Sequence, residues 1–234
     1  MANFNGPGNH HRHFKEVLRL QLLARLAQPH DPLIRLAQLG DDQFDYLRGP
    51  DVPFPKMGVT TIVGPGTGLG VAQLLKTDDG YHVIETEGGH MDFAPLDPLE
   101  DQIVTYLRRT LRRISVERIA SGGGFDNLYA ALATIEGKPV PGSLDDKALW
   151  TAALEGRDPV AVAALDRFFL SLGAIAGDLA LAHGANAVVI AGGLGYRLRD
   201  RFATSGFADR FIAKGRFERR MEANPVKLLI HPHP

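Results

Sequence analysis

The sequence predicts a mixed α/β fold, and three observations carry that prediction. Val59–Val63 and Ala187–Ala191 are short runs rich in β-branched or apolar residues, and each is followed by glycines, as expected of strands. Between them, Leu99–Arg112 places apolar residues one helical turn apart. Strand patterns that alternate with helical patterns, with glycine at the strand ends, are typical of α/β proteins.

The first 57 residues contribute little to this pattern. Phe14–Ala27 has the apolar spacing of an amphipathic helix that Pro29 ends, and Leu33–Leu39 is a second, shorter helical pattern. Residues 41–57 contain three closely spaced prolines. Because proline cannot donate to a sheet ladder, this segment is predicted to be a loop or an edge element.

The next segment predicts a strand, a glycine loop and a hairpin. Val59–Val63 enters Gly64–Gly70, and Val71–Leu75 and Tyr81–Ile84 follow as two strands joined by the turn Thr77–Gly80. The loop therefore connects strand to strand. A P-loop is excluded because no Gly-Lys-Ser/Thr follows the glycines. A dinucleotide fingerprint is excluded because no helix follows and the glycines fall at 64, 66, 68 and 70.

The second half is predicted to be mainly helical. Beyond Leu99–Arg112, Ser115 is expected to cap a short helix that the glycines at 122–124 stop. Asp158 and Pro159 are the cap and first-turn proline of a long apolar helix. The remaining predicted elements are helices at 127–135, from Ser143 with Asp146 in a capping-box spacing, at 159–183 and from about Arg197, and a strand at 226–230.

Composition excludes several classes of function. The 26 Lys and Arg balance 27 Asp and Glu, so no basic face argues for nucleic acid. The absence of cysteine excludes disulfides, thiolate metal sites and a cysteine nucleophile. No uncharged apolar run has membrane-spanning length and the N-terminus has no apolar signal core. We therefore expect a soluble, cytoplasmic protein that binds neither nucleic acid nor membrane.

Taken singly, the motifs leave alternatives open. The glycines at 64–70 can expose backbone N–H groups to a phosphate, or form a connection without a ligand. Glu87 and His90, beside Asp92, suit vicinal sugar hydroxyls better than a metal, although a hydrated loop is the alternative. Gly192–Gly193 marks either a ligand-binding strand end or a turn. The histidines at 10, 11, 13, 231 and 233 fit terminal tails better than a metal site, and no metal site is predicted.

Five segments in order resemble the bacterial-type, ATP-dependent glucokinase family of the hexokinase and actin-like superfold. They are GPGTGLGVAQLL (64–75), EGGHMDFAP (87–95), SVERIASGGGFDNLY (115–129), AGGL (191–194) and SGFADRFIAKGRF (205–217). The resemblance implies the large domain of a ribonuclease H-like ATPase fold. It also implies phosphoryl transfer from ATP, bound with Mg²⁺, to the 6-hydroxyl of glucose, which is the first step of glycolysis, and commonly a homodimer.

The resemblance assigns the site residues by position. The substrate-binding residues are Glu87, His90 and Glu117, the last of which the residues alone do not single out. The nucleotide-binding residues are Gly64, Gly66, Thr67 and Gly68 in the second phosphate loop, with Gly192 and Gly193 on the adenosine side.

The chain also departs from the family pattern. It lacks the first phosphate loop, Asp-x-Gly-Gly-Thr, and the Asn-Asp-Phe motif whose aspartate is the general base; extending the alignment without gaps puts Gln28 at that position. The final family helix is missing too. We therefore predict a truncated chain, with a divergent segment and small-domain remnant at 1–57 and the large domain at 58–234.

Two further expectations follow from these departures. The chain is predicted to be a poor or inactive glucose kinase, and the alternative is a non-catalytic sugar and nucleotide binder. A DNA-binding sugar sensor is disfavoured because no basic patch or helix-turn-helix is present. Residues 1–32 have the composition expected of an out-of-frame reading of a GC-rich gene, a hypothesis that the coding DNA tests.

Overall fold

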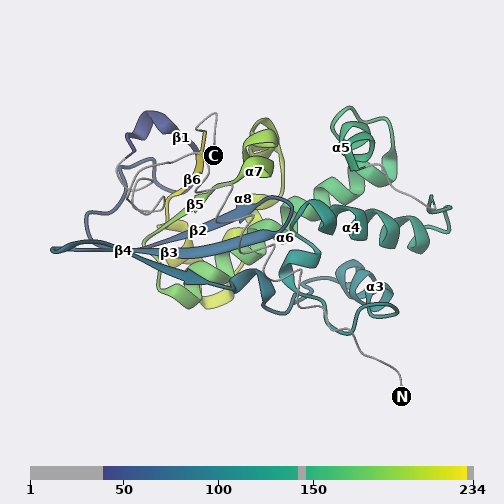
Figure 1. Ribbon diagram of the computed structural model, residues 1–234, viewed down its shortest axis with the longest axis horizontal. Coiled ribbons are helices and arrows are strands. Elements are labelled where there is room, and N and C mark those ends of the chain that lie inside the picture. Colours follow the sequence, from purple (N-terminus) through teal and green to yellow (C-terminus); the bar gives the residue numbers. More distant parts are fainter. Residues whose placement is uncertain (1–38, 142–145, 231–234) are drawn as a thin grey trace, which may run out of the picture.

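The computed structural model describes residues 39–141 and 146–230, which form a six-stranded sheet with helices (Figure 1). The strand order is β1-β6-β5-β2-β3-β4, and both parallel and antiparallel pairs occur. The mixed α/β prediction is confirmed. The helices expected at 14–27 and 33–39, the cap at Ser143 and the histidine tails lie outside the described residues, Leu39 excepted.

The predicted strand, glycine loop and hairpin are present. β2 (Gly58–Pro65) pairs antiparallel with β3 (Leu69–Thr77), which pairs antiparallel with β4 (Gly80–Thr86). β5 (Ala187–Ile190) runs parallel to β2, with Thr61 beside Val188. These parallel partners bring their carboxyl ends to the same edge of the sheet.

One edge of the sheet comes from the proline-rich segment. β1 (Phe44–Arg48) pairs antiparallel with β6 (Val226–Leu229), which runs parallel to β5. β1 therefore joins the same sheet as the strands after residue 58. The domain division at 57/58 stays a prediction.

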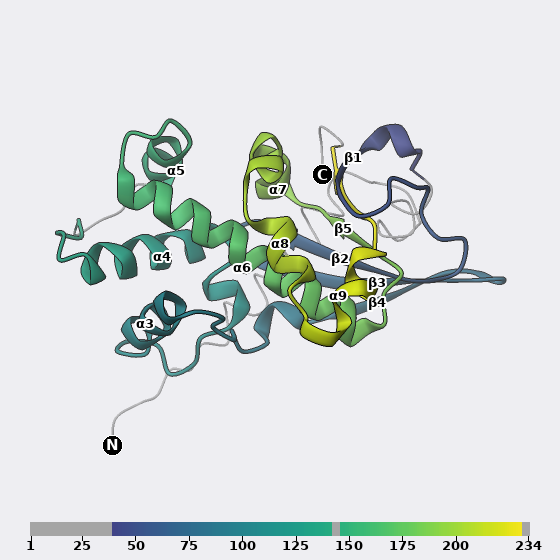
Figure 2. The ribbon, with the colours of Figure 1, turned by 180° about the vertical axis from the view of Figure 1, so that it is seen from behind.

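The long helix α6 (Pro159–His183) lies against one face of the sheet and extends to the other helices (Figure 2). Its start is as predicted, because Asp158 caps Val160 N and Ala161 N through Oδ1. By length and hydropathy α6 could span a membrane. However, 72% of its most apolar stretch is buried within the protein, as is typical of a core helix.

Helix α8 (Phe207–Ile212) packs on α6 at very short range, because α6 carries glycine at two contact points. A Cβ at Gly173 would lie 2.2 Å from Phe207 O, and one at Gly177 would lie 2.4 Å from Phe211 O. The two backbones can approach this closely only without side chains at those positions.

Three helical predictions need correction. Gly122–Gly124 do not stop a helix; they form the first turn of α4 (Gly122–Ile135), because Ser121 Oγ accepts from Gly124 N and caps it. The segment before it is only a 3-10 turn, Val116–Arg118, and the Ser115 side chain does not cap it. The helix α7 (Gly193–Arg197) begins four residues earlier than expected, directly after the glycine turn.

The remaining helices lie at two places, around one end of α6 and next to α8. α3 (Pro98–Leu107) ends five residues before the predicted Arg112, and α5 (Asp146–Leu154) and α4 both pack on α6. Figure 1 shows α3, α4 and α5 gathered at one end of α6, away from the hairpin of β3 and β4. The short helix α9 (Glu218–Glu222) follows α8.

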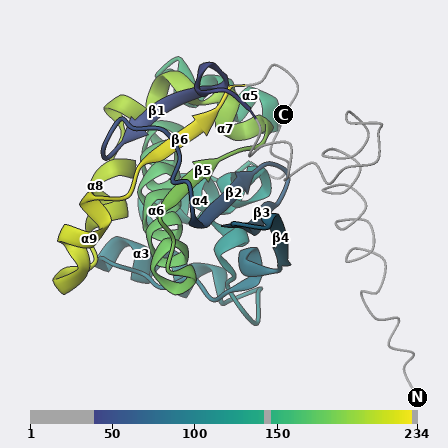
Figure 3. The same cartoon turned by 90° about the vertical axis from the view of Figure 1, so that its left-hand side faces the viewer.

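The two faces of the sheet bury different sets of side chains. One face contributes Val63, Val188 and Ile190 to the large core shared with α4 and α6. The opposite face contributes Ile62 and Val189 to a smaller cluster. Figure 3 shows the strands in order along the sheet, with α6 and α8 on the same face.

Asp126 on α4 and Asp146 on α5 are neighbouring acidic residues, and they predict that the stability of the fold depends on pH. Burial, together with the neighbouring Asp146, raises the pKa of Asp126 from 3.8 to about 6. A folded-state pKa above the unfolded value means that the native state binds more protons, so stability falls as pH rises from about 4 to 6. Asp126→Asn removes this group. We expect the free energy of unfolding of the variant, relative to that of the wild type, to be larger at pH 7.5 than at pH 5, as measured by urea unfolding. An equal difference at both pH values would contradict the prediction.

Candidate functional site

The candidate site lies where β2 and β5 end, at the carboxyl edge of the parallel pair, the position where α/β sheets commonly bind ligands. Ala191 N donates to Val63 O at 2.9 Å and continues the pairing to that edge. Gly192 then takes φ 90°, and a Cβ there would lie 2.9 Å from Pro65 O. The glycine turn after β5 therefore contacts the glycine loop after β2.

The glycine loop is short and braced from two sides. Gly66 N donates to Gly68 O at 2.8 Å, which closes the loop upon itself. Gly66 O accepts from Gly122 N at 2.8 Å, so the first turn of α4 abuts the loop. Thr67 is exposed between these two contacts. Thr67 is therefore the exposed residue of this loop, and glycine-rich loops of this kind can bind an anion through backbone N–H groups.

Glu87 and His90 lie on the turn that follows β4. Glu87 Oε2 and His90 Nε2 are 4.0 Å apart, and their side chains are 52% and 33% exposed. The turn is held by Thr86, whose Oγ1 donates to Val71 O at 2.9 Å and accepts from Gly88 N at 3.2 Å. Both groups are therefore anchored to β3 while their polar ends remain accessible.

The same turn is seated on the start of β3. A Cβ at Gly89 would lie 2.0 Å from Leu69 O, so only glycine allows this approach. On the other side of Leu69, its N–H donates to Glu117 Oε2 at 3.1 Å. Leu69 thus joins the Glu87–His90 turn, the Glu117 carboxylate and the end of the glycine loop.

The segment that carries Glu117 is also bonded to the Glu87–His90 turn through the backbone. Val116 N donates to Met91 O at 2.8 Å, and Phe93 N donates to Ile114 O at 2.9 Å. The three predicted sugar-binding residues therefore come from two segments that are bonded to each other beside the glycine loop, although Glu117 is distant from Glu87 and His90 along the chain.

The family model named Glucokinase matches residues 35–234. The chain belongs to the glucokinase family. It is similar to a glucokinase of Zymomonas mobilis, with 59% identity over 199 residues that cover 85% of this chain and 61% of the relative. A glucokinase of Nitrobacter hamburgensis is 41% identical over 76% of this chain and 55% of its own length.

Solved structures of the family share the fold. A glucokinase from an Antarctic psychrotroph superimposes with a TM-score of 0.76 and 32% identity, over 82% of this chain and 59% of the other. A Balamuthia mandrillaris glucokinase, solved in complex with glucose, gives a TM-score of 0.70 at 23% identity, over 86% and 58%. The predicted hexokinase and actin-like fold is confirmed, and the chain spans about three fifths of the length of these relatives.

The nucleotide-side predictions fall on two separate loops. Gly64 lies near the end of β2, Gly66, Thr67 and Gly68 lie between β2 and β3, and Gly192 and Gly193 lie at the start of α7. Contacts link the two loops through Pro65 and Gly192. Their assignment to phosphate and adenosine stays a prediction, as does that of the sugar-binding residues.

Sequence reasoning missed the role of the glycines at 122–124, which it assigned to a helix stop. They begin α4 and touch the glycine loop instead. The available signal was Ser121, a favoured N-cap residue directly before a segment with helical apolar spacing. Among the described residues, no three His, Asp or Glu side chains lie close enough to share a metal ion.

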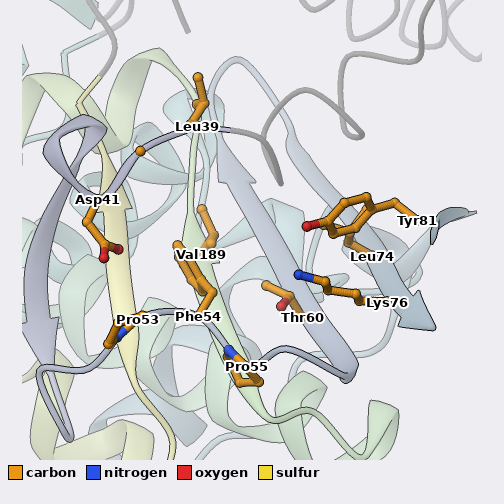
Figure 4. Close-up of a pocket in the computed structure, with 11 residues that line it drawn as sticks. Leu39, Asp41, Pro53, Phe54, Pro55, Thr60, Leu74, Lys76, Tyr81 and Val189 are labelled. Carbon is orange, nitrogen blue, oxygen red and sulfur yellow. The ribbon is translucent and has the colours of Figure 1, made fainter. Parts of the chain in front are cut away.

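A separate cavity of about 280 Å³ lies on the face of the sheet that is turned away from α6 (Figure 4). Phe54, Leu74 and Val189 are among the residues that line it, and Lys76 lies over the ring of Tyr81 with 4.9 Å from Nζ to the ring centre. It contains none of the predicted site residues, and its lining along β2 is Thr60, toward the start of the strand. The candidate site at the glycine loop is therefore separate from this cavity.

Proposed function

We propose that this chain carries the sugar-binding and nucleotide-binding lobe of an ATP-dependent glucokinase, which transfers the γ-phosphoryl group of ATP to the 6-hydroxyl of glucose. The bond between Glu117 Oε2 and Leu69 N carries the proposal. It places a predicted sugar-binding carboxylate at the end of the predicted phosphate loop, and phosphoryl transfer requires the two substrates to meet there.

Each group has a role that follows from its chemistry. Glu87, His90 and Glu117 exchange hydrogen bonds with the glucose hydroxyls, since carboxylates accept and imidazole can do either. The backbone N–H group at Thr67 binds the phosphates, whereas the Gly66 N–H is already used on Gly68 O. Gly192–Gly193 leave room for the adenosine. Mg²⁺ enters with ATP and neutralises charge on the phosphates.

The proposal also includes that the enzyme is cytoplasmic, acts in glycolysis and forms homodimers. The alternative is a non-catalytic binder, which the lack of a recognisable general base favours. Calorimetry with glucose and with a non-hydrolysable ATP analogue tests binding, which both functions require. An assay coupled to glucose 6-phosphate formation separates the two, and absence of binding to either ligand contradicts both.

Glu117→Gln is expected to weaken glucose binding by about 10- to 100-fold, because a hydrogen bond to a charged group contributes about 1.5–3 kcal/mol. The variant keeps the shape of the side chain. Calorimetric Kd values for glucose measure the effect. Glu85→Gln, at an exposed position of β4, is the matched control and should leave the Kd unchanged. Equal Kd values for the Glu117→Gln variant and the wild type would contradict the assignment.

A further inference from the structure

Ser121 lies between the two halves of the candidate site and is 2% exposed. Its Oγ donates to Glu117 O at 2.7 Å and accepts from Gly124 N at 3.0 Å. The first bond ties the hydroxyl to the residue that presents the predicted sugar-binding carboxylate. The second caps α4.

The residues at each end of this short segment bond to the two ends of the glycine loop. Glu117 Oε2 accepts from Leu69 N at 3.1 Å, and Gly122 N donates to Gly66 O at 2.8 Å. The Ser121 hydroxyl joins these two contacts, because it holds Glu117 on one side and the first turn of α4 on the other. Gly124 fits against the same backbone, since a Cβ there would lie 3.0 Å from Glu117 O.

A helix cap alone does not need the first of these bonds. Any acceptor side chain can cap Gly124 N, whereas the proton of the Ser121 hydroxyl is used on Glu117 O. We propose that Ser121 is a positioning residue that sets the Glu117 carboxylate and the phosphate loop in register with each other. This inference rests on the proposed function, and it adds a residue outside the predicted ligand contacts.

The test compares Ser121→Ala with Ser115→Ala in the full chain. Ser115 is also buried, lies six residues earlier, and its side chain caps nothing, so it is the matched control. Calorimetry should show about tenfold weaker glucose binding and about threefold weaker binding of the ATP analogue for Ser121→Ala only. Ser121→Thr keeps the hydroxyl and should restore both values.

A double-mutant cycle tests the route of the effect. If Ser121 acts on glucose through Glu117, Ser121→Ala should change the glucose Kd by less than twofold in the Glu117→Gln background. Its effect on the ATP analogue, which passes through Gly122 and Gly66, should remain. A lower melting temperature with unchanged Kd values would overturn the proposal and leave Ser121 as a helix cap only.

Hydrogen exchange supplies a readout that needs no ligand. Ser121→Ala should speed amide exchange at Leu69 and Gly122 by at least about tenfold relative to Ser115→Ala, because both N–H groups depend on the held segment. Unchanged exchange at both amides overturns the proposal even if the wild type binds no ligand. If the wild type binds neither ligand but exchange is faster in Ser121→Ala, the proposed function is contradicted. The structural link from Ser121 to Leu69 and Gly122 is then retained.

Discussion

The purified chain is expected to phosphorylate glucose about 10²- to 10⁴-fold more slowly than the glucokinase of Zymomonas mobilis. The attacking 6-hydroxyl must lose its proton, and a well-placed general base contributes about that factor. The family supplies the base from an Asn-Asp-Phe motif, which does not occur in this sequence. In the proposed function, Glu87, His90 and Glu117 bond the sugar hydroxyls, and none of them is proposed as the base.

The measurement is kcat with Mg·ATP and saturating glucose in a coupled assay, with the relative assayed beside it. Glucose binding by calorimetry serves as the control, because a chain that binds glucose but turns it over slowly has lost catalysis and not the site. A kcat within tenfold of the relative would contradict the prediction.

Two adjacent glycines in α4 are expected to respond in opposite directions to the same substitution. A Cβ at Gly124 would lie 2.5 Å from Ile119 O, whereas one at Gly123 would have no neighbour within 4 Å. Gly124→Ala should therefore destabilise the fold by about 3 kcal/mol, the upper end of the usual cost of overpacking. Gly123→Ala should gain about 0.5–1 kcal/mol from the better helix former.

Urea unfolding of both variants gives the two free energies of unfolding. Because Gly124 also lies against Glu117 O, its variant should weaken glucose binding in the calorimeter, measured well below the unfolding transition. Comparable stability of the two variants would show that the α4 start can shift away from Glu117 without cost.

Local patterns predicted much of the fold. The β-branched run before Gly64, the hairpin turn at Thr77–Gly80 and the cap at Asp158 all depend on near neighbours in the chain, and all are confirmed. The glycine run at 122–124 was assigned wrongly because glycine is a poor helix former in isolation. There, a cap from Ser121 and close contact with the Glu117 backbone outweigh that preference.

The candidate site divides in the same way. The sequence by itself determined the family and the ordered motifs that carry Glu87, His90 and Glu117, because short motifs keep their residues in order along the chain. Only the tertiary structure decided that Gly89, in the turn that carries Glu87 and His90, and the Glu117 carboxylate both contact Leu69, the latter by a bond that spans 48 positions. Such contacts depend on how the sheet and α4 pack against each other, and no local spacing encodes that approach.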